Sequence, residues 1–174
     1  NLVEEGFDMA IRIGELEDST LVSKRVGTAH NVTCASQSYL DKHGKPRHPD
    51  ELRYHIGMQY SNIPYKQQWR FETPEGKTIQ AQPQIRVRAN NGESLAAAAS
   101  AGLGVTTGPT FILGKYIRDG RLVCILKEYQ RPSVGIYAVY PPGRLTPKRI
   151  QVFSDFISGR YGEHPYWDDG LGAS

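Results

Sequence analysis

The sequence predicts an α/β fold, and three observations carry this prediction. Residues 8–14 (DMAIRIG) have the near-continuous apolar character of a buried parallel strand. Residues 2–5 are typical of the last turn of a helix that Gly6 ends. Near the other end of the chain, residues 146–159 have the clearest amphipathic helix pattern, with Pro147 in the first turn. Strands that alternate with helices in this way are typical of an α/β layer.

The first third of the chain alternates strands with short helices. Ser36 follows the second of two apolar strands and is placed to cap a helix that Gly44 ends. Pro49 is well placed in the first turn of another short helix. The elements expected here are strands at 21–26, 30–35 and 58–60, a helix at 39–43, and a proline-rich loop with a capped helix within 45–56.

An alternating segment on each side of the turn at residues 74–76 (PEG) predicts a β-hairpin. Its strands are residues 69–73 and 77–82, and we expect the hairpin to be an exposed flap. The strand that follows alternates Ile85, Val87 and Ala89 with two arginines, so Arg86 and Arg88 are expected to face solvent.

Residues 88–109 (RANNGESLAAAASAGLGVTTGP) predict a capped helix followed by a strand. Asn90 and Glu93 have the spacing of a capping box, so the helix should begin at Asn90 or Asn91. Gly102 is placed as a left-handed residue at its end. The N-terminus of such a helix suits an anion or a carbonyl oxygen, because its N–H groups lack partners. A capped, alanine-rich helix can equally be a packing helix with no ligand, so both interpretations remain open.

The remainder of the chain predicts two helices and two strands. The strand at 134–140 is a second buried strand, and the tail at 163–174 is polar, rich in glycine and expected to be loosely held. The other elements are a helix at 110–118, a turn at 119–120, a strand at 122–126, and the helix at 146–159 with Ile150, Phe153, Phe156 and Ile157 on one apolar face.

The composition fits one full domain or two small lobes of a globular protein. The 174 residues are 39% hydrophobic and carry a net charge of +3. Lys and Arg are scattered along the sequence and form no run, so we do not expect this chain itself to bind DNA. No apolar stretch reaches membrane-spanning length and no signal peptide is recognised, so the expected location is the cytoplasm. The chain begins without methionine and looks like a fragment that starts in mid-fold.

Cys34 and Cys124 lie in apolar, strand-like segments, which favours reduced, buried thiols over a disulfide. A thiol nucleophile pairing Cys34 with a histidine is an alternative. However, Cys34 lies in mid-strand and not at a helix N-terminus, where the pKa of a thiol falls. No H-x-x-x-H or C-x-x-C spacing occurs. We therefore expect no metal, no cofactor and no enzyme activity.

The order and spacing of the motifs over nearly all of the chain resemble the C-terminal effector-binding domain of LysR-type transcriptional regulators. The matching pieces are LVEEGFDMAIRIGELEDSTLVSKRVG, VTCASQSYLDKHGKPRHPDEL, WRFETPEGK, RVRANNGESLAAAASAGLGV, GRLV, IYAVYPPGRLTPKRIQVFSDFI and PYWDD.

The resemblance implies a fold like that of type 2 periplasmic binding proteins, with two α/β lobes joined by two crossover strands. A small-molecule effector would lie between the lobes. Residues 30–36 and 135–140 would be the crossovers. Lobe I would comprise residues 1–32 and 130–174, and lobe II residues 33–129. The first lobe would be incomplete at its N-terminus, because the winged helix-turn-helix, the linker helix and the first strand-helix-strand unit of a complete member do not precede Asn1.

The family pattern places nine residues of this chain near the effector. The residues that follow a strand or open a helix in that pattern are Ser36, Gln37, Asn90, Asn91, Gly92, Thr107, Gly108 and Pro109, and Arg12 is a weaker candidate. Each also has an ordinary structural interpretation: Ser36 and Asn90 as helix caps, Gly108 as a turn residue. Because Arg12 lies within an apolar strand, its charged group should either reach solvent at a sheet edge or form an ion pair with an acidic side chain.

The function implied is that of a ligand-sensing regulatory domain. The effector would be a small polar or anionic metabolite, with aromatic acids equally compatible. It would change the angle between the lobes and so the spacing of DNA-binding heads in a homodimer or tetramer. DNA would be contacted only through the missing N-terminal domain, and no membrane partner is expected. The alternative is a solute-binding protein of a transport system, which has the same fold but would be exported.

Overall fold

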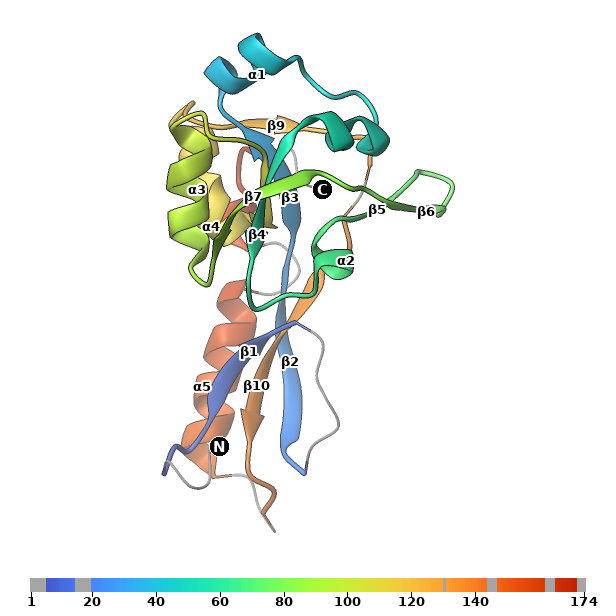
Figure 1. The fold of residues 1–174 in the computed structure, drawn as a ribbon. Helices are drawn as coiled ribbons and strands as arrows, with labels where there is room; N and C mark the ends of the chain where they lie inside the picture. The colour runs from blue at the N-terminus through green and yellow to red at the C-terminus, as the bar shows by residue number, and fades with distance from the viewer. Residues whose placement is uncertain (1–5, 15–19, 130, 144–146, 162–164, 172–174) are drawn as a thin grey trace. The chain divides into compact units, whose positions relative to one another are not determined.

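The computed structural model describes residues 6–14, 20–129, 131–143, 147–161 and 165–171 (Figure 1). The chain forms two compact units. Unit 1 comprises Asn1–Ala29 and Ser133–Asp169, and unit 2 comprises His30–Pro132 and Gly170–Ser174. The helical turn predicted at residues 2–5, the predicted helix start at Thr146, and tail residues 163, 164 and 172–174 lie outside the described residues.

Unit 1 is built on a three-stranded antiparallel sheet. Its strands are β1 (Ala10–Ile13), β10 (Val134–Tyr140) and β2 (Val22–Ala29), in the order β1-β10-β2. The prediction of a buried parallel strand at residues 8–14 is therefore wrong. β1 is antiparallel to β10 and is an edge strand, and Ile11 and Ile13 are 41% and 48% exposed. The helix of this unit packs along β2, at the opposite edge of the sheet. Among the described residues β1 pairs with β10 alone.

That helix is α5 (Lys148–Tyr161). Ile150, Ser154 and Ile157 form its buried stripe, because positions i, i+4 and i+7 share one helical face. The prediction that Phe153 and Phe156 share the buried face is wrong, since they are 47% and 62% exposed. Both phenylalanines lie on the flank of the stripe, where steps of about 100° per residue place them.

The main sheet of unit 2 is also antiparallel, with the order β8-β3-β9. β3 (Asn31–Ala35) is its central strand, between β8 (Thr106–Pro109) and β9 (Val123–Ile125). A parallel pair, β4 (Ile56–Tyr60) and β7 (Gln84–Ala89), joins it through a single bridge between Gly57 and Val105. The arginines of β7 are exposed, as predicted.

The predicted hairpin forms, with strands β5 (Arg70–Glu72) and β6 (Thr78–Gln80). The expectation of an exposed flap holds for residues 74–78 around the turn, which are exposed, but it is wrong for the first strand, where Trp69 and Phe71 are completely buried. Alternation along a short strand predicted two unequal faces, but it could not show that the apolar face meets the rest of unit 2. Trp69 and Phe71 join a core cluster with Ala35, Leu52 and Ile125 among its members.

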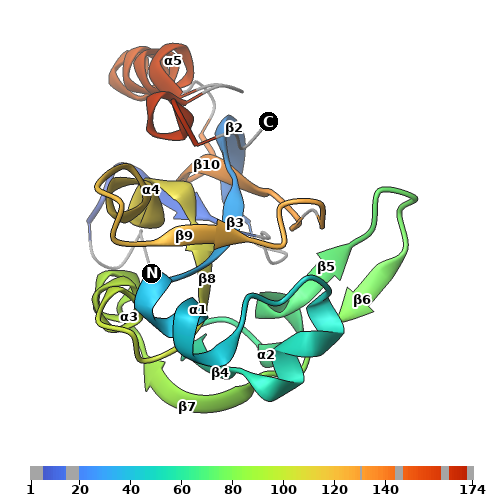
Figure 2. The same ribbon diagram turned by 90° about the horizontal axis from the view of Figure 1, so that it is seen from above.

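The helices of unit 2 follow the predicted order, with one addition, α2 (Tyr65–Gln68). α3 (Gly92–Ser100) and α4 (Thr110–Arg118) pack on one side of the β8-β3-β9 sheet (Figure 2). The apolar core between them includes Cys34, Met58, Leu95, Leu113 and Cys124. The short helices are α1 (Gln37–His43) and the 3-10 helix η1 (Pro49–Tyr54), while a second 3-10 helix, η2 (Tyr166–Asp168), belongs to unit 1.

Candidate functional site

The N-terminus of α3 is capped by Asn91. The side-chain oxygen of Asn91 accepts a hydrogen bond from the Ser94 backbone N–H at 2.9 Å. The capping box predicted for Asn90 and Glu93 does not form, because the Glu93 carboxylate lies 2.9 Å from the Lys115 ammonium of α4 instead. The helix thus begins at one of the two predicted positions, and it ends as predicted, with Gly102 left-handed (φ 84°).

The same contacts bring the start of α3 beside α4. Besides Lys115, the Tyr116 hydroxyl lies 3.3 Å from the Glu93 carboxylate. A Cβ atom on Gly92 would approach the Ile112 side chain to 2.6 Å, so only glycine fits there without a shift of Ile112. Gly92 thus lies against the first turn of α4, which follows directly on Pro109.

Ser36 and Gln37 lie at the other end of α3. The Ser36 hydroxyl caps α1 by accepting a hydrogen bond from Tyr39 N–H, and it lies near Gly102, beyond the last turn of α3. The ten residues between Asn91 and Gly102 span about 15 Å at 1.5 Å per residue. Gln37 is exposed and donates to Asp41 at 2.7 Å. The structure therefore does not bring Ser36 and Gln37 together with residues 90–92.

Thr107 is the predicted site residue with the richest polar surroundings. It pairs directly with Thr33 across β8 and β3, and the Thr33 hydroxyl donates to the Thr107 hydroxyl at 3.4 Å. The Thr107 hydroxyl donates in turn to the Val32 carbonyl at 3.2 Å. It also accepts a hydrogen bond from Nη1 of Arg131, a residue that the sequence did not single out.

Arg131 is a cation without an anion. Its Nε–H is buried and has no hydrogen-bond partner, and no acidic side chain among the described residues forms an ion pair with it. Its guanidinium carbon lies 5.3 Å from the centre of the Phe71 ring, a cation–π distance. Burial lowers the pKa of Arg131 to about 9, which still leaves the group charged at neutral pH. A charge held in this way favours an anionic partner.

The chain reaches Arg131 through an unusual backbone conformation. Leu126, the first residue after β9, is left-handed with φ 56°, which is uncommon for a residue other than glycine. Its carbonyl accepts from Tyr129 N–H at 3.0 Å, and the next residue after Arg131 is anchored by a 2.9 Å hydrogen bond from Asn31 Nδ2 to the Pro132 carbonyl. No pattern in the loop sequence indicated Arg131, because its role depends on strands that lie far from it in sequence.

Gly108 and Arg12 complete the set of predicted site residues. Gly108 is half-buried on β8 and pairs with Val32, so it is a strand residue rather than a turn residue. Arg12 is exposed on edge strand β1, which is one of the two outcomes expected for its charge. It belongs to unit 1, whereas the other eight predicted residues belong to unit 2.

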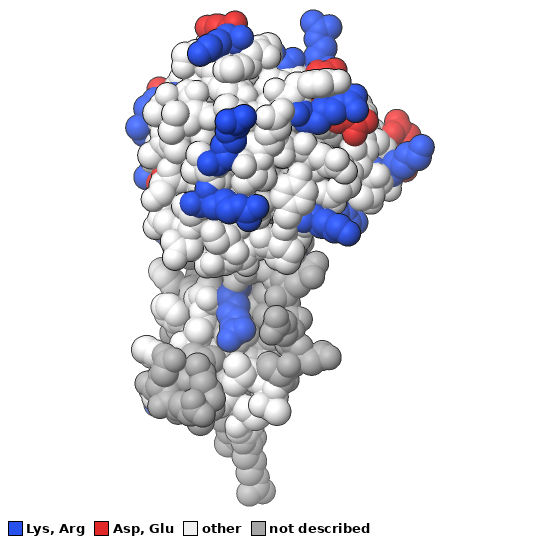
Figure 3. Space-filling model, viewed as in Figure 1, with Lys and Arg blue, Asp and Glu red and all other residues white. Residues whose placement is uncertain are grey.

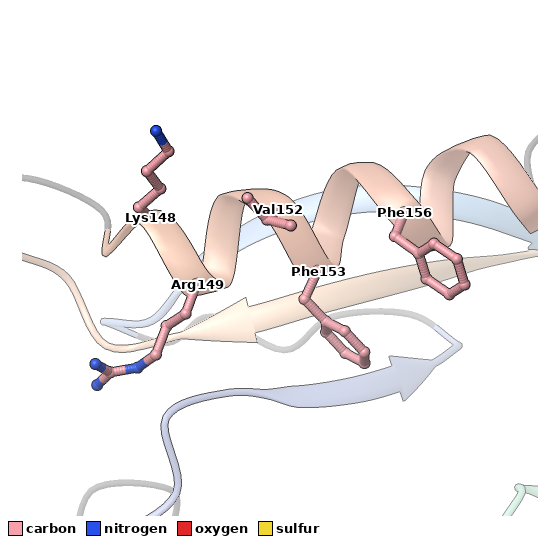
Figure 4. Close-up of a pocket in the computed structure, with 5 residues that line it drawn as sticks. All are labelled: Lys148, Arg149, Val152, Phe153 and Phe156. Carbon is pink, nitrogen blue, oxygen red and sulfur yellow. The ribbon is translucent and has the colours of Figure 1, made fainter.

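An open hollow of about 500 Å³ lies on the surface of α5 (Figure 4). It is lined by Lys148, Arg149, Val152, Phe153 and Phe156, and none of these is a predicted site residue. The Arg149 guanidinium is paired with Asp8 at 2.6 Å, so the surface left to a ligand is mostly apolar. This hollow does not resemble a site for a polar metabolite.

The charges on one face of the molecule are dispersed. On the face in Figure 3, Lys and Arg side chains lie apart from one another, and several have Asp or Glu neighbours. Within the described ranges no cluster of His, Cys, Asp and Glu could hold a metal ion, and no helix is long and apolar enough to cross a membrane.

The chain builds two mixed α/β units and passes through unit 1 twice, which is the arrangement of periplasmic-binding-protein-like domains. The family model of the LysR substrate binding domain matches residues 1–161. The chain belongs to this family.

The relatives are transcriptional regulators. An uncharacterized HTH-type transcriptional regulator of Haemophilus influenzae is 39% identical over 154 residues, which cover 88% of this chain and 53% of the relative. The HTH-type transcriptional activator AaeR of Escherichia coli is 32% identical over 163 residues, covering 94% of this chain and 52% of the relative. The chain thus spans about half the length of these relatives. The regulator interpretation holds over the transport alternative.

Solved structures agree with this assignment. The full-length Vibrio cholerae virulence activator AphB matches with a TM-score of 0.75 and 27% identity, over 90% of this chain and 53% of that one. The regulatory domain of CrgA from Neisseria meningitidis matches with a TM-score of 0.74 and 27% identity, over 90% of this chain and 76% of that one. The predicted fold class is confirmed.

Proposed function

We propose that this chain is the effector-sensing half of a transcriptional regulator that controls DNA binding by a helix-turn-helix segment outside the sequence. The family assignment and the relatives, which carry such a segment in their names, support this proposal. The sensing half acts by binding and not by catalysis. Because its target is DNA, the regulator works in the cytoplasm, as a homodimer or a tetramer.

The effector is a small anionic metabolite with a carboxylate group. The observation that supports this class is the guanidinium of Arg131, which has no anionic partner among the described residues. A carboxylate accepts two parallel N–H bonds from a guanidinium, and the free Nε–H of Arg131 can supply one of them. The Phe71 ring, which already faces the guanidinium, limits the water that would compete for it.

Thr107 is the sequence-predicted residue that fits this site best, because its hydroxyl fixes one end of the guanidinium. We place Arg131 and Thr107 at the centre of the proposed site. The contributions of the other predicted residues, and the location of the effector between the predicted lobes, stay predictions.

A thermal-shift screen tests the class of ligand. Small carboxylates, phosphorylated metabolites and uncharged analogues of the same size are compared on the wild-type chain, on Arg131→Gln and on Arg88→Gln. Arg88 is exposed on β7, so Arg88→Gln removes the same charge from the surface and serves as the matched control.

Carboxylates are expected to raise the melting temperature of the wild-type chain and of Arg88→Gln, but not that of Arg131→Gln. An uncharged ligand that stabilises all three proteins equally would contradict the carboxylate proposal. A carboxylate that stabilises Arg131→Gln as much as wild type would place the site elsewhere. DNA control is tested separately, by measuring operator affinity of the full-length regulator with and without a ligand found in the screen.

A further inference from the structure

The two cysteines of the chain face each other across two strands. Cys34 of β3 and Cys124 of β9 are direct partners in the antiparallel register, and their sulfur atoms lie 3.7 Å apart. Both residues are buried, at 0% and 7% exposure, and both are free thiols. The burial predicted for these cysteines is confirmed, but their proximity was not predicted.

The positions satisfy the geometry of a disulfide. Direct partners in an antiparallel pair have Cα atoms about 4.5–5.5 Å apart, within the range of about 4.4–6.8 Å that disulfides span. The sulfur atoms must approach from 3.7 Å to a bond of about 2 Å, which side-chain rotation can supply without a change of register. The chain contains only these two cysteines, so no other intramolecular disulfide can compete.

We propose that Cys34 and Cys124 form a reversible dithiol–disulfide pair that a peroxide oxidises inside the folded unit 2. The reaction has two steps. The Cys124 thiolate attacks one oxygen of the peroxide, the O–O bond breaks, and Cys124 becomes a sulfenic acid while the other oxygen leaves as hydroxide or an alkoxide. The Cys34 sulfur then attacks the Cys124 sulfur, the S–O bond breaks, and water leaves. Two thiols are oxidised by two electrons in all, and the peroxide is reduced.

The surroundings of the pair favour Cys124 as the sulfur that reacts first. A hydrogen bond from the Cys34 thiol lowers the pKa of Cys124, and the charge of Lys127 acts in the same direction, against the burial that raises it. The hydrogen bond to Cys124 and deeper burial raise the pKa of Cys34. Cys124 is also the more exposed of the two, so a small peroxide reaches it more easily.

Oxidation would act on the strands that carry the proposed anion site. Cys34 is adjacent to Thr33, and the two side chains lie on opposite faces of β3. β9 is an edge strand of three residues that leads through Leu126 to Arg131. A disulfide would fix β9 to β3 and restrict the segment that holds the guanidinium. This consequence rests on the proposed function, whereas the oxidation itself does not.

The oxidation is tested on the native wild-type chain. The protein is treated with hydrogen peroxide, quenched, unfolded in the presence of N-ethylmaleimide, and weighed by mass spectrometry. We expect loss of two hydrogen atoms, no maleimide adduct, and a peptide joining Cys34 to Cys124 after digestion. Treatment with dithiothreitol before alkylation should restore both adducts.

Single variants separate the roles of the two sulfur atoms. Cys34→Ser should accumulate a sulfenic acid on Cys124 that dimedone traps, and Cys124→Ser should leave Cys34 unmodified. Two maleimide adducts on peroxide-treated wild type would overturn the proposal. So would a disulfide found only between two chains, or a sulfinic acid on one cysteine without the internal cross-link. If the cross-link forms in a chain that binds no carboxylate in the thermal-shift screen, only the proposed function is overturned.

Discussion

Nη1 of Arg131 donates a hydrogen bond to the Thr107 hydroxyl, which joins the segment after β9 to strand β8. The Thr107 hydroxyl also contacts Thr33 and Val32, so the guanidinium is tied to both strands of this pair. A site that holds a cation ready for an anion stores an unfavourable free energy until that anion arrives.

Arg131→Met should therefore not destabilise the ligand-free chain. The change removes a partly buried charge but keeps an apolar side chain against Phe71, and we expect the free energy of unfolding to rise by about 1 kcal/mol. Urea unfolding in buffer without carboxylates measures this, with Arg88→Met as the exposed control, expected within about 0.5 kcal/mol of wild type. A loss of more than about 1 kcal/mol in Arg131→Met would mean that the guanidinium is structural.

Asn91→Ala should cost about 1 kcal/mol of stability, because it leaves the Ser94 N–H at the start of α3 without its acceptor. Asn90→Ala removes the neighbouring amide, which is exposed and does not cap the helix, and should change stability much less. Thermal unfolding of the two variants side by side checks this. Equal losses would show that the two asparagines share the cap.

Gly104→Ala should destabilise unit 2 by about 2 kcal/mol or more. Gly104 has φ 157°, and a Cβ atom there would approach the Ile56 carbonyl oxygen to 2.6 Å, a backbone contact that cannot rotate away. Gly159→Ala is the matched control, because it lies exposed in α5 with no atom near its Cβ position. It should gain about 0.5–1 kcal/mol from helix propensity. The two variants are compared by denaturant unfolding.

The stability of the chain should fall as pH falls below the ordinary pKa of histidine, and His55 should be a cause. Burial, followed by the charge of His43, lowers the pKa of His55 in the folded chain, while Glu51 acts in the opposite direction. The unfolded chain therefore takes up a proton first as the pH falls below about 6.5, which favours unfolding; above pH 7 both states are neutral and the effect vanishes.

Urea unfolding of the wild type and of His55→Gln between pH 7.5 and 5.5 measures this dependence. The variant should lose less stability over the interval than the wild type, because it has no group at position 55 to protonate. Parallel curves for the two proteins would show that His55 does not contribute.

Local signals explain why much of the fold could be predicted. Ser36, Gly44 and Gly102 fixed helix ends through backbone hydrogen bonds that involve near neighbours only. The strands at 134–140 and 85–89 followed from apolar patterning. The errors concern burial, which depends on segments that are distant in the sequence. β1 is exposed because it lies at a sheet edge. Phe71 is buried because the hairpin packs against a core cluster.

The candidate site was less predictable for the same reason. Residues 90–92 and 107–109 were predicted from the order of motifs in the family. That order does not show that Ser36 lies at the opposite end of α3 from residues 90–92. Arg131 was missed because its partner, Thr107, is 24 positions away and its aromatic neighbour, Phe71, is 60 positions away. Pairing over such distances leaves no periodic trace in a single sequence.

The ends of the segment His30–Pro132 meet at one hydrogen bond, between the Asn31 side chain and the Pro132 carbonyl. A segment with adjoining ends can be exchanged as a module, because replacing it changes only two peptide junctions in the host. Gly170–Ser174, which also belongs to unit 2, would stay with the host. Chimeras that graft the corresponding segment of a relative between residues 29 and 133 should keep the host unit intact. The same exchange during evolution would change the ligand that the proposed regulator binds, while unit 1 stays the same.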